Sequence, residues 1–337
     1  MSQKPKLETV AREAGVSTAT VSQVMRGTGR ISEKTRKKVI AAAEKLHYVP
    51  DARAASMRSG QNREIGFVIN QISNPFNAEV ISGVSDLLEA EGFLVSVLDA
   101  RNDPERQRRH IEAFIRNGRG GLLWVPATNV PPAVYDLIRA HRTPTVTFLR
   151  RSAAGHFDHV GIRNAEATRT ATQYLADLGH RHIAYLGGVE ATDVRHDRIE
   201  GYMQAVAERG LEAPVVWDSD DNKMAGLEAM LELRAAHPET TAVVCNGDMV
   251  ALGACLGLIR IGQQPGEDVS VIGFDDIQDA AVATPSLTTM ATSPYRLGRR
   301  LARVLLDRIK EPDMPVTISE VSAELVVRES TGPAVTR

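Results

Sequence analysis

The sequence predicts an α/β protein in which two doubly wound parallel-sheet lobes follow an all-α helix-turn-helix headpiece. Three observations support this prediction. Small apolar residues recur at helical spacing on both sides of a glycine near the N-terminus, the first 60 residues are basic while the rest is acidic, and from Glu64 onward short apolar runs alternate with amphipathic segments. Short strands separated by helical crossovers are typical of parallel sheets.

Residues 7–25 predict the helix-turn-helix. Apolar residues at helical spacing precede the turn: Leu7, Val10, Ala11 and Ala14. Gly15 permits a sharp reversal, and Ser17 is placed to cap a second helix. The start of that helix would enter the DNA major groove, so its small and polar residues are candidates for base and phosphate contacts: Ser17, Thr18, Ala19, Thr20, Ser22 and Gln23. The alternative is an ordinary helical hairpin.

A third helix is predicted from Glu33 to Leu46, with Ser32 as its N-cap and Pro50 following its end. It is rich in basic residues, namely Lys34, Arg36, Lys37, Lys38 and Lys45. Residues 1–60 hold twelve Lys or Arg against five Asp or Glu, whereas the remainder holds 28 against 37. A basic head on an acidic body is typical of a nucleic-acid-binding module joined to another domain.

This N-terminal run resembles the headpiece of the LacI/GalR family of bacterial repressors. The matching pieces are Thr9-Val10-Ala11, Ala14-Gly15-Val16-Ser17, Thr20-Val21-Ser22, Val24, Thr35-Arg36, Val39 and Tyr48-Val49-Pro50. The resemblance implies a DNA-binding headpiece over residues 1–50, a hinge helix or linker over 51–61 and an effector-binding, dimerising core over 62–337. It adds Thr9, Arg26, Tyr48 and Met57 to the candidate DNA contacts.

Two headpiece positions depart from the family pattern. Gln23 replaces a common arginine, which removes one positive charge from the recognition helix. Met57 replaces the leucine that wedges into the minor groove, a swap of similar volume and greater flexibility. We interpret both as altered operator preference rather than lost DNA binding.

The body alternates apolar runs with helical segments. Strands are predicted at Ile65–Ile69, Phe93–Leu98, Gly121–Val125, Thr145–Leu149, Ile183–Leu186, Ala242–Cys245 and Val269–Phe274, and an amphipathic helix at Asn77–Ala90. The body resembles the periplasmic-binding-protein-like core of the same family. That resemblance implies discontinuous lobes, an N-lobe of about 62–161 plus 291–321 and a C-lobe of about 162–290 plus 322–331.

In such folds ligands settle beyond the carboxyl ends of the strands. The resemblance makes six residues candidates for effector binding: Phe76, Asn77, Arg150, Arg198, Asp221 and Asp275. Several positions depart from the family. Leu149 replaces an aspartate, Asp221 an aromatic and Gly247 an asparagine, while Arg163 stands where an aspartate is frequent.

Fewer carboxylates and more guanidinium groups favour an anionic effector, because arginine binds carboxylate or phosphate bidentately. We therefore expect a sugar acid or sugar phosphate rather than a neutral sugar. The alternative is that Arg150, Arg151 and Arg163 are exposed or pair with Asp158 and Asp221.

Three functions are considered. The favoured one is a ligand-responsive repressor of carbohydrate or sugar-acid catabolism genes that binds a palindromic operator as a homodimer. The others are a solute-binding receptor for transport, and a DNA-binding regulator controlled by a protein partner instead of a small molecule. The sequence lacks a Gly-rich phosphate loop, a zinc motif and a nucleophile elbow, so we expect neither an enzyme nor a cofactor.

No metal site is expected either, because His180 leads into a strand and the aspartates of residues 218–221 lack the glycine and glutamate of a calcium loop. Cys245 and Cys255 lie in apolar segments and are expected to be packed thiols. The sequence has no apolar run of spanning length and no signal-peptide pattern, which predicts a cytoplasmic protein without membrane contact.

Overall fold

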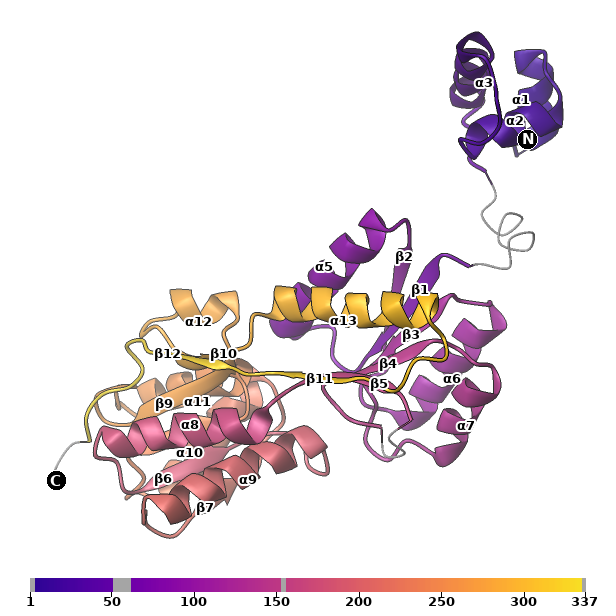
Figure 1. Ribbon diagram of the computed structural model, residues 1–337. Helices are drawn as coiled ribbons and strands as arrows, with labels where there is room; N and C mark the ends of the chain where they lie inside the picture. The colour runs from indigo at the N-terminus through magenta and orange to yellow at the C-terminus, as the bar shows by residue number, and fades with distance from the viewer. Residues whose placement is uncertain (1–3, 51–61, 153–155, 335–337) are drawn as a thin grey trace. The chain divides into compact units, whose positions relative to one another are not determined.

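The computed structural model describes residues 4–50, 62–152 and 156–334 (Figure 1). The chain forms two compact units, Met1–Asn62 and Arg63–Arg337. The predicted hinge over 51–61, including Met57, lies outside the described residues. Among the helices that are described, none is both long and apolar enough to cross a bilayer.

The first unit is a three-helix headpiece that contains the predicted helix-turn-helix. Its helices are α1 (Leu7–Ala14), α2 (Thr18–Met25) and α3 (Glu33–Lys45). Gly15 adopts a left-handed φ of 65° at the turn after α1, which glycine tolerates without strain. The Oγ atoms of Ser17 and Ser32 accept the N-cap hydrogen bonds of α2 and α3. Val10, Val21 and Val39 form the fully buried centre of the headpiece.

The N-lobe is built on a six-stranded sheet in the order β11-β5-β4-β3-β1-β2, with every pairing parallel. Its strands are β1 (Glu64–Ile69), β2 (Leu94–Asp99), β3 (Gly121–Trp124), β4 (Thr145–Phe148), β5 (Asp158–Ile162) and β11 (Ile318–Val321). Helices α5 (Pro75–Ala90) and α13 (Pro294–Lys310) pack together over one face. Helices α6 (Pro104–Arg116) and α7 (Pro132–Ala140) cover the other face (Figure 1).

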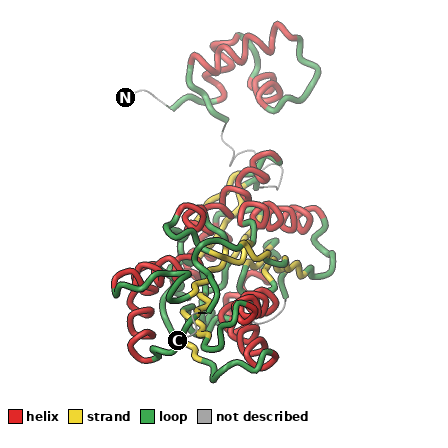
Figure 2. Tube along the Cα trace, turned by 90° about the vertical axis from the view of Figure 1, so that its left-hand side faces the viewer, coloured by secondary structure: helices red, strands yellow, loops and turns green. Residues whose placement is uncertain are grey.

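The C-lobe has a second six-stranded sheet in the order β12-β10-β9-β8-β6-β7. Its strands are β6 (Ile183–Leu186), β7 (Val215–Trp217), β8 (Ala242–Cys245), β9 (Ser270–Asp275), β10 (Thr288–Ala291) and β12 (Glu324–Val326). Its helices are α8 (Asn164–Asp177), α9 (Asp193–Glu208), α10 (Lys223–Ala236), α11 (Asp248–Arg260) and the short α12 (Gln278–Val282). Helices α8 and α9 pack together, as do α10 and α11, and Figure 2 shows helices surrounding the strands of the core.

The chain passes between the two lobes three times, after β5, after β10 and after β11. Figure 1 shows the resulting pair of lobes, with α13 lying over the N-lobe although it follows most of the C-lobe in sequence. Each sheet therefore completes its edge with a strand from the C-terminal part of the chain. The lobes are joined by several short segments rather than by one linker.

The structure differs from the predicted elements in three respects. Strand β12 pairs antiparallel with β10, so the C-lobe sheet is not wholly parallel. Five strands were not predicted, namely β5, β7, β10, β11 and β12. Four of them carry polar residues, such as Asp158 in β5 and Thr288 in β10, and β7 has only three residues. The helix predicted from Asn77 begins earlier, at Pro75, where the Asn74 side chain caps it.

Candidate functional site

The start of α2 presents a small, polar surface in the headpiece. Ser17, Thr18 and Ala19 are exposed, while Thr20, Ser22 and Gln23 are partly exposed. The Ser17 and Thr20 hydroxyl oxygens lie 2.9 Å apart, within hydrogen-bond distance. The predicted recognition residues between Ser17 and Gln23 therefore lie close together at the N-cap and first turns of α2.

The remaining headpiece candidates flank this turn. Arg26 is exposed at the end of α2, and its Nε donates to the Ser22 carbonyl at 3.1 Å. Thr9 is partly buried on α1, and Tyr48 packs against the headpiece core. The lysines of α3 at positions 34, 37 and 38 are exposed as well.

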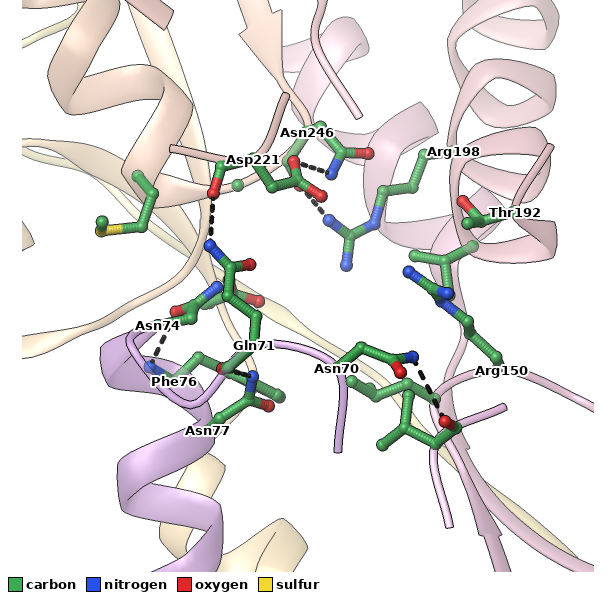
Figure 3. A pocket seen from close by; sticks show the side chains of 16 residues that line it. Asn70, Gln71, Asn74, Phe76, Asn77, Arg150, Thr192, Arg198, Asp221 and Asn246 are labelled. Carbon is green, nitrogen blue, oxygen red and sulfur yellow. Dashed lines mark hydrogen bonds between the residues drawn. The ribbon is translucent and has the colours of Figure 1, made fainter. Parts of the chain in front are cut away.

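The six predicted effector residues are brought together in one cleft between the lobes (Figure 3). Its lining residues are Asn70, Gln71, Asn74, Phe76, Asn77, Val125, Leu149, Arg150, Thr192, Val194, Arg198, Asp221, Asn246, Gly247, Met249 and Asp275. Many follow the carboxyl ends of β1, β3, β4, β8 and β9, as expected for parallel sheets. The cavity volume is about 120 Å³.

Amide side chains build the N-lobe wall. The Asn70 Nδ2 donates to the carbonyls of Val125 and Pro126 at 3.2 and 3.1 Å. The fully buried Gln107 donates from Nε2 to Asn70 Oδ1 at 3.2 Å. These bonds fix the Asn70 amide at the end of β1, where its orientation is set before any ligand arrives.

An aromatic pair and an interlobe contact complete this wall. Phe76 is only 4% exposed and stacks on Phe148, with ring centroids 6.4 Å apart. Gln71 Nε2 donates to the Asp221 carbonyl of the C-lobe at 3.1 Å (Figure 3). Little of the Phe76 ring is therefore accessible from the cleft. Gln71 connects the N-lobe side of the cleft to the C-lobe side.

Arg150 projects from the N-lobe toward the cleft (Figure 3). Its Nη1 donates to Asn102 Oδ1 at 2.7 Å and to the Pro126 carbonyl at 3.2 Å. Burial lowers the pKa of the Arg150 guanidinium. Its hydrogen-bond acceptors are neutral groups that orient the guanidinium, and the Asp193 and Asp221 carboxyl groups act on its charge without a hydrogen bond.

Arg198 projects from α9 in the C-lobe and is 5% exposed. Its guanidinium carbon lies 3.6 Å from the centre of the Phe274 ring, a cation–π contact. Its Nε donates to Asn164 Oδ1 at 2.8 Å, and its Nη1 donates to the Asn246 carbonyl. The hydrogen-bond acceptors of Arg198 are therefore neutral, as those of Arg150 are, and its charge also stabilises the nearby Asp221 and Asp275 carboxylates.

Two carboxyl groups share the cleft with these arginines. Asn246 Nδ2 donates to Asp221 Oδ1 at 2.7 Å, and Tyr185 donates its hydroxyl to Asn246 Oδ1 at 2.8 Å. Burial raises the pKa of Asp221 and that of Asp275. Asp275 also adopts a φ of 116°, a strained conformation for a non-glycine residue.

Asp248 holds the segment that follows the strained residue Asp275. It is fully buried, and its Oδ2 accepts a hydrogen bond from the Ile277 amide at 2.9 Å. Its Oδ1 accepts the Thr289 hydroxyl at 2.6 Å. Burial raises the pKa of Asp248 to about 7. The carboxyl group thus ties the start of α11 to the segment that carries Asp275 and to β10.

The arginines considered at sequence level take separate places. Arg150 lines the cleft, but Arg151 binds Asp197 and Glu320 outside it. Arg163 lies 3.7 Å from Glu166 and is 54% exposed. Arg151 and Arg163 are exposed, and Arg150 interacts with the Asp221 carboxyl group, as the alternative held. The suggested partnership with Asp158 is wrong, because the Arg308 Nε lies 2.7 Å from that carboxylate.

The structure also reveals lining residues that the sequence did not identify. The family resemblance implies an asparagine at position 247, where this chain has glycine. In the structure the preceding residue, Asn246, lines the cleft and contacts Asp221. The amides at Asn70, Gln71 and Asn74 were not identified as candidates, although they follow a predicted strand. Cys245 and Cys255 are buried free thiols, and His180 is hydrogen-bonded in the C-lobe core.

Comparison with known proteins identifies both units. Residues 6–51 match a family model described as bacterial regulatory proteins, lacI family. Residues 172–331 match a model described as a periplasmic binding protein-like domain. The HTH-type transcriptional repressor PurR of Pectobacterium carotovorum is 32% identical over 328 residues, covering 96% of each chain.

Two solved structures extend the likeness to three dimensions. A complex of the transcriptional regulator CelR with cellobiose is 29% identical, with a TM-score of 0.74 and coverage of 97% of this chain and 99% of the other. A LacI family regulator from Enterococcus faecium with bound ribose is 26% identical, with a TM-score of 0.74 and coverage of 81% and 100%. The fold and its helix-turn-helix unit are thus shared with ligand-responsive DNA-binding proteins.

Proposed function

This chain belongs to the lacI family of bacterial regulatory proteins, and we propose that it represses its target genes through a cleft that takes a small polyhydroxylated acid. As a family member it is a DNA-binding transcriptional repressor and not an enzyme. The solute-receptor alternative loses its basis, because the match includes the DNA-binding unit. Its action is proposed to take place in the cytoplasm, at the operator.

The headpiece is proposed to read half of a roughly palindromic operator, with two protomers pairing as a homodimer. The exposed start of α2 supplies the proposed base and phosphate contacts, which are Ser17, Thr18, Ala19, Thr20, Ser22 and Gln23. Thr9, Arg26 and Tyr48 are proposed as flanking contacts, and the exposed lysines of α3 add positive charge. The proposed role of Met57 falls outside the described residues.

The effector class rests on one observation. Among the described residues, the guanidinium groups of Arg150 and Arg198 hydrogen-bond only to neutral oxygens. The carboxyl groups that act on them without a hydrogen bond include Asp221 and Asp275, whose pKa values burial raises, which weakens this compensation. A carboxylate or phosphate would satisfy such pre-oriented cations bidentately. The amides and the Asp275 carboxyl group would then bind the hydroxyls of the same ligand.

Size and shape favour a sugar derivative over the other ligand classes. The cavity of about 120 Å³ is below the roughly 300–1,000 Å³ of sites for drug-sized ligands, which favours a single ring. A flat nucleobase would find little of the Phe76 ring to stack on, since that ring is 4% exposed and already packed on Phe148. The two compared structures hold cellobiose and ribose, and we propose an acidic relative of such sugars here.

Effector binding would change the affinity for DNA through the lobes. Coupling free energies between two sites are typically ~1–3 kcal/mol, or about 5–150-fold in affinity. Ligand occupancy and operator binding would then form one equilibrium. Control by a protein partner remains the alternative that a negative ligand screen would favour.

The test is a thermal-shift screen of the full chain against neutral sugars, sugar acids, sugar phosphates and nucleobases. A ligand at 100 times its Kd adds ~2.7 kcal/mol to stability, which such a screen detects. We expect stabilisation by acids or phosphates only, and its loss in Arg150→Gln. Stabilisation by neutral sugars or nucleobases alone would contradict the proposed class, and each hit is then tested for its effect on operator binding.

A further inference from the structure

Two pairs of consecutive residues meet where the lobes face each other. Arg150 and Arg151 follow β4 in the N-lobe, while Asp197 and Arg198 are consecutive on α9 in the C-lobe. Arg150 and Arg198 line the cleft. Their neighbours form an ion pair outside it, with Arg151 Nη2 lying 2.7 Å from Asp197 Oδ2.

Arg151 is anchored in both lobes. The same Nη2 donates at 3.2 Å to Glu320 on β11, a strand of the N-lobe sheet. The Arg151 backbone amide donates to Asp193 Oδ2 of α9 at 2.7 Å. One guanidinium therefore has one carboxylate partner in its own lobe and one in the opposite lobe. Figure 3 shows the side chains of Arg150 and Arg198 in the cleft.

The Arg151–Asp197 ion pair favours closure of the cleft, whereas the repulsion between Arg150 and Arg198 disfavours it. Moving the lobes together brings the like charges of Arg150 and Arg198 closer. Their repulsion grows as the separation falls, although the nearby Asp221 carboxyl group, which interacts with both, reduces it. The Arg151–Asp197 attraction grows with the same movement, one residue away on each chain segment. It is the described interlobe ion pair nearest to both cleft arginines along the chain.

We infer that Arg151 and Asp197 are positioning residues that set the separation of Arg150 and Arg198, and with it the affinity of the cleft for an anionic group. The inference rests on the proposed function in taking this cleft as the effector site. Neither residue of the pair lines the cleft. Both line an open groove outside it together with Glu320, so salt has access to the pair and weakens it.

The two partners of Arg151 provide a matched pair of variants. Asp197→Asn removes the interlobe charge, and Glu320→Gln removes the intralobe charge from the same guanidinium. Lobe separation is measured by energy transfer between dyes on Arg116→Cys in α6 and Glu232→Cys in α10. Both positions are exposed, whereas Cys245 and Cys255 are buried. An excess of unlabelled chain keeps dye pairs within one protomer.

We expect Asp197→Asn to lower the closed-to-open ratio by up to about fivefold, the range of partly exposed ion pairs, and Glu320→Gln to leave it unchanged. Arg151→Gln should match Asp197→Asn, and combining the two should add no further change. The wild-type ratio should fall with added salt and that of Asp197→Asn should not. Equal changes in both single variants, or no change in either, would overturn the inference.

D-glucuronate is the probe for the affinity of the cleft. Its Kd should rise in Asp197→Asn by the factor seen in the dye measurement and should be unchanged in Glu320→Gln. An unchanged Kd in Asp197→Asn would overturn the link to the arginines. If D-glucuronate binds none of the chains, the acid effector fails as a proposal, and the dye measurement still decides whether the ion pair sets the lobe separation.

Discussion

In the headpiece, six of the ten candidate DNA contacts lie between Ser17 and Gln23 at the start of α2, whereas the cleft collects its lining from segments spread between residues 70 and 275. The headpiece side chains are held by one or two local bonds, such as the one between Ser17 and Thr20. Those of the cleft are buried in networks that also hold the core together. A substitution at the headpiece surface should therefore change binding alone, while one in the cleft should change binding and stability.

The largest effect is expected from Arg198→Ala. The change removes a cleft cation and leaves Asn164, the Asn246 carbonyl and the nearby acids without their partner. Loss of one member of a buried charged group costs ~3–5 kcal/mol, so the core should be destabilised and the effector response abolished. Urea unfolding and titration with the ligand identified by the screen measure the two effects.

Arg195→Ala is the matched control, because Arg195 lies on the same helix and pairs with Asp218 away from the cleft lining. It should keep the effector response. Operator binding without effector should survive both changes, because the headpiece is a separate compact unit. An unaltered effector response in Arg198→Ala would remove that residue from the site.

Asp248 should make the stability of the core depend on pH, in contrast to that of the headpiece. Burial raises its folded-state pKa to about 7 from the ordinary value of 3.8, so the folded core keeps this proton longer than the unfolded chain. Its contribution to stability is fully present below about pH 4 and is lost as the pH rises to 7. At ~1.36 kcal/mol per pKa unit, wild type should lose ~2–4 kcal/mol more across that window than Asp248→Asn, which does not titrate.

This difference is measured by urea unfolding of the core at about pH 4.5, near the lower end of the window, and at about pH 7.5, just above its upper end. Glu228→Gln, an exposed change on α10, should keep the wild-type slope. Headpiece unfolding should be equal in wild type and Asp248→Asn, since Asp248 belongs to the other unit. If the stability of the core depends on pH in the same way in wild type and in Asp248→Asn, Asp248 does not carry the proton.

The comparison also explains which features the sequence could predict. The helix-turn-helix depends on contacts close in sequence, so Gly15 and Ser17 were enough to place its turn and its second cap. The buried strands of the core were predicted from apolar runs such as Ile65–Ile69. Strand β5 was not, because its Asp158 and His159 find their partners, Arg308 and Thr147, only in the folded lobe.

The cleft was predicted in part for the same reason. All six residues chosen through the family resemblance do line it. The sequence could not predict that Arg150 lines the cleft while Arg151 forms ion pairs outside it. That difference depends on which carboxylates of α9 and β11 lie close to each arginine in the fold. Asn246 was not identified because the resemblance placed the asparagine at position 247, and only the fold shows that Asn246 contacts Asp221.

A matched pair of core valines tests whether the two units are independent. Val21 in the headpiece and Val243 in β8 are both fully buried. Deleting two methyl groups costs ~2 kcal/mol including the cavity left behind. In thermal unfolding, Val21→Ala should lower the midpoint of the headpiece alone and Val243→Ala that of the core alone. Val21→Ala should weaken operator binding and leave the Kd for the effector unchanged, and Val243→Ala should do the reverse. Equal effects of either change on both transitions would mean that the units unfold together.

The smallest effect is expected at Gln23, where the headpiece lacks a charge. Gln23 is partly exposed on α2, and a guanidinium added there adds one cation next to the DNA. If Gln23→Arg contacts a phosphate, the slope of log Kd against log salt should steepen by ~0.9, with affinity rising equally on all sequences. If it contacts a base edge, the slope should stay constant and preference should change at one base pair per half-site. Fluorescence anisotropy on an operator and on random DNA separates these outcomes. No change in either would place residue 23 outside the DNA-binding surface and shorten that surface to the first turn of the helix.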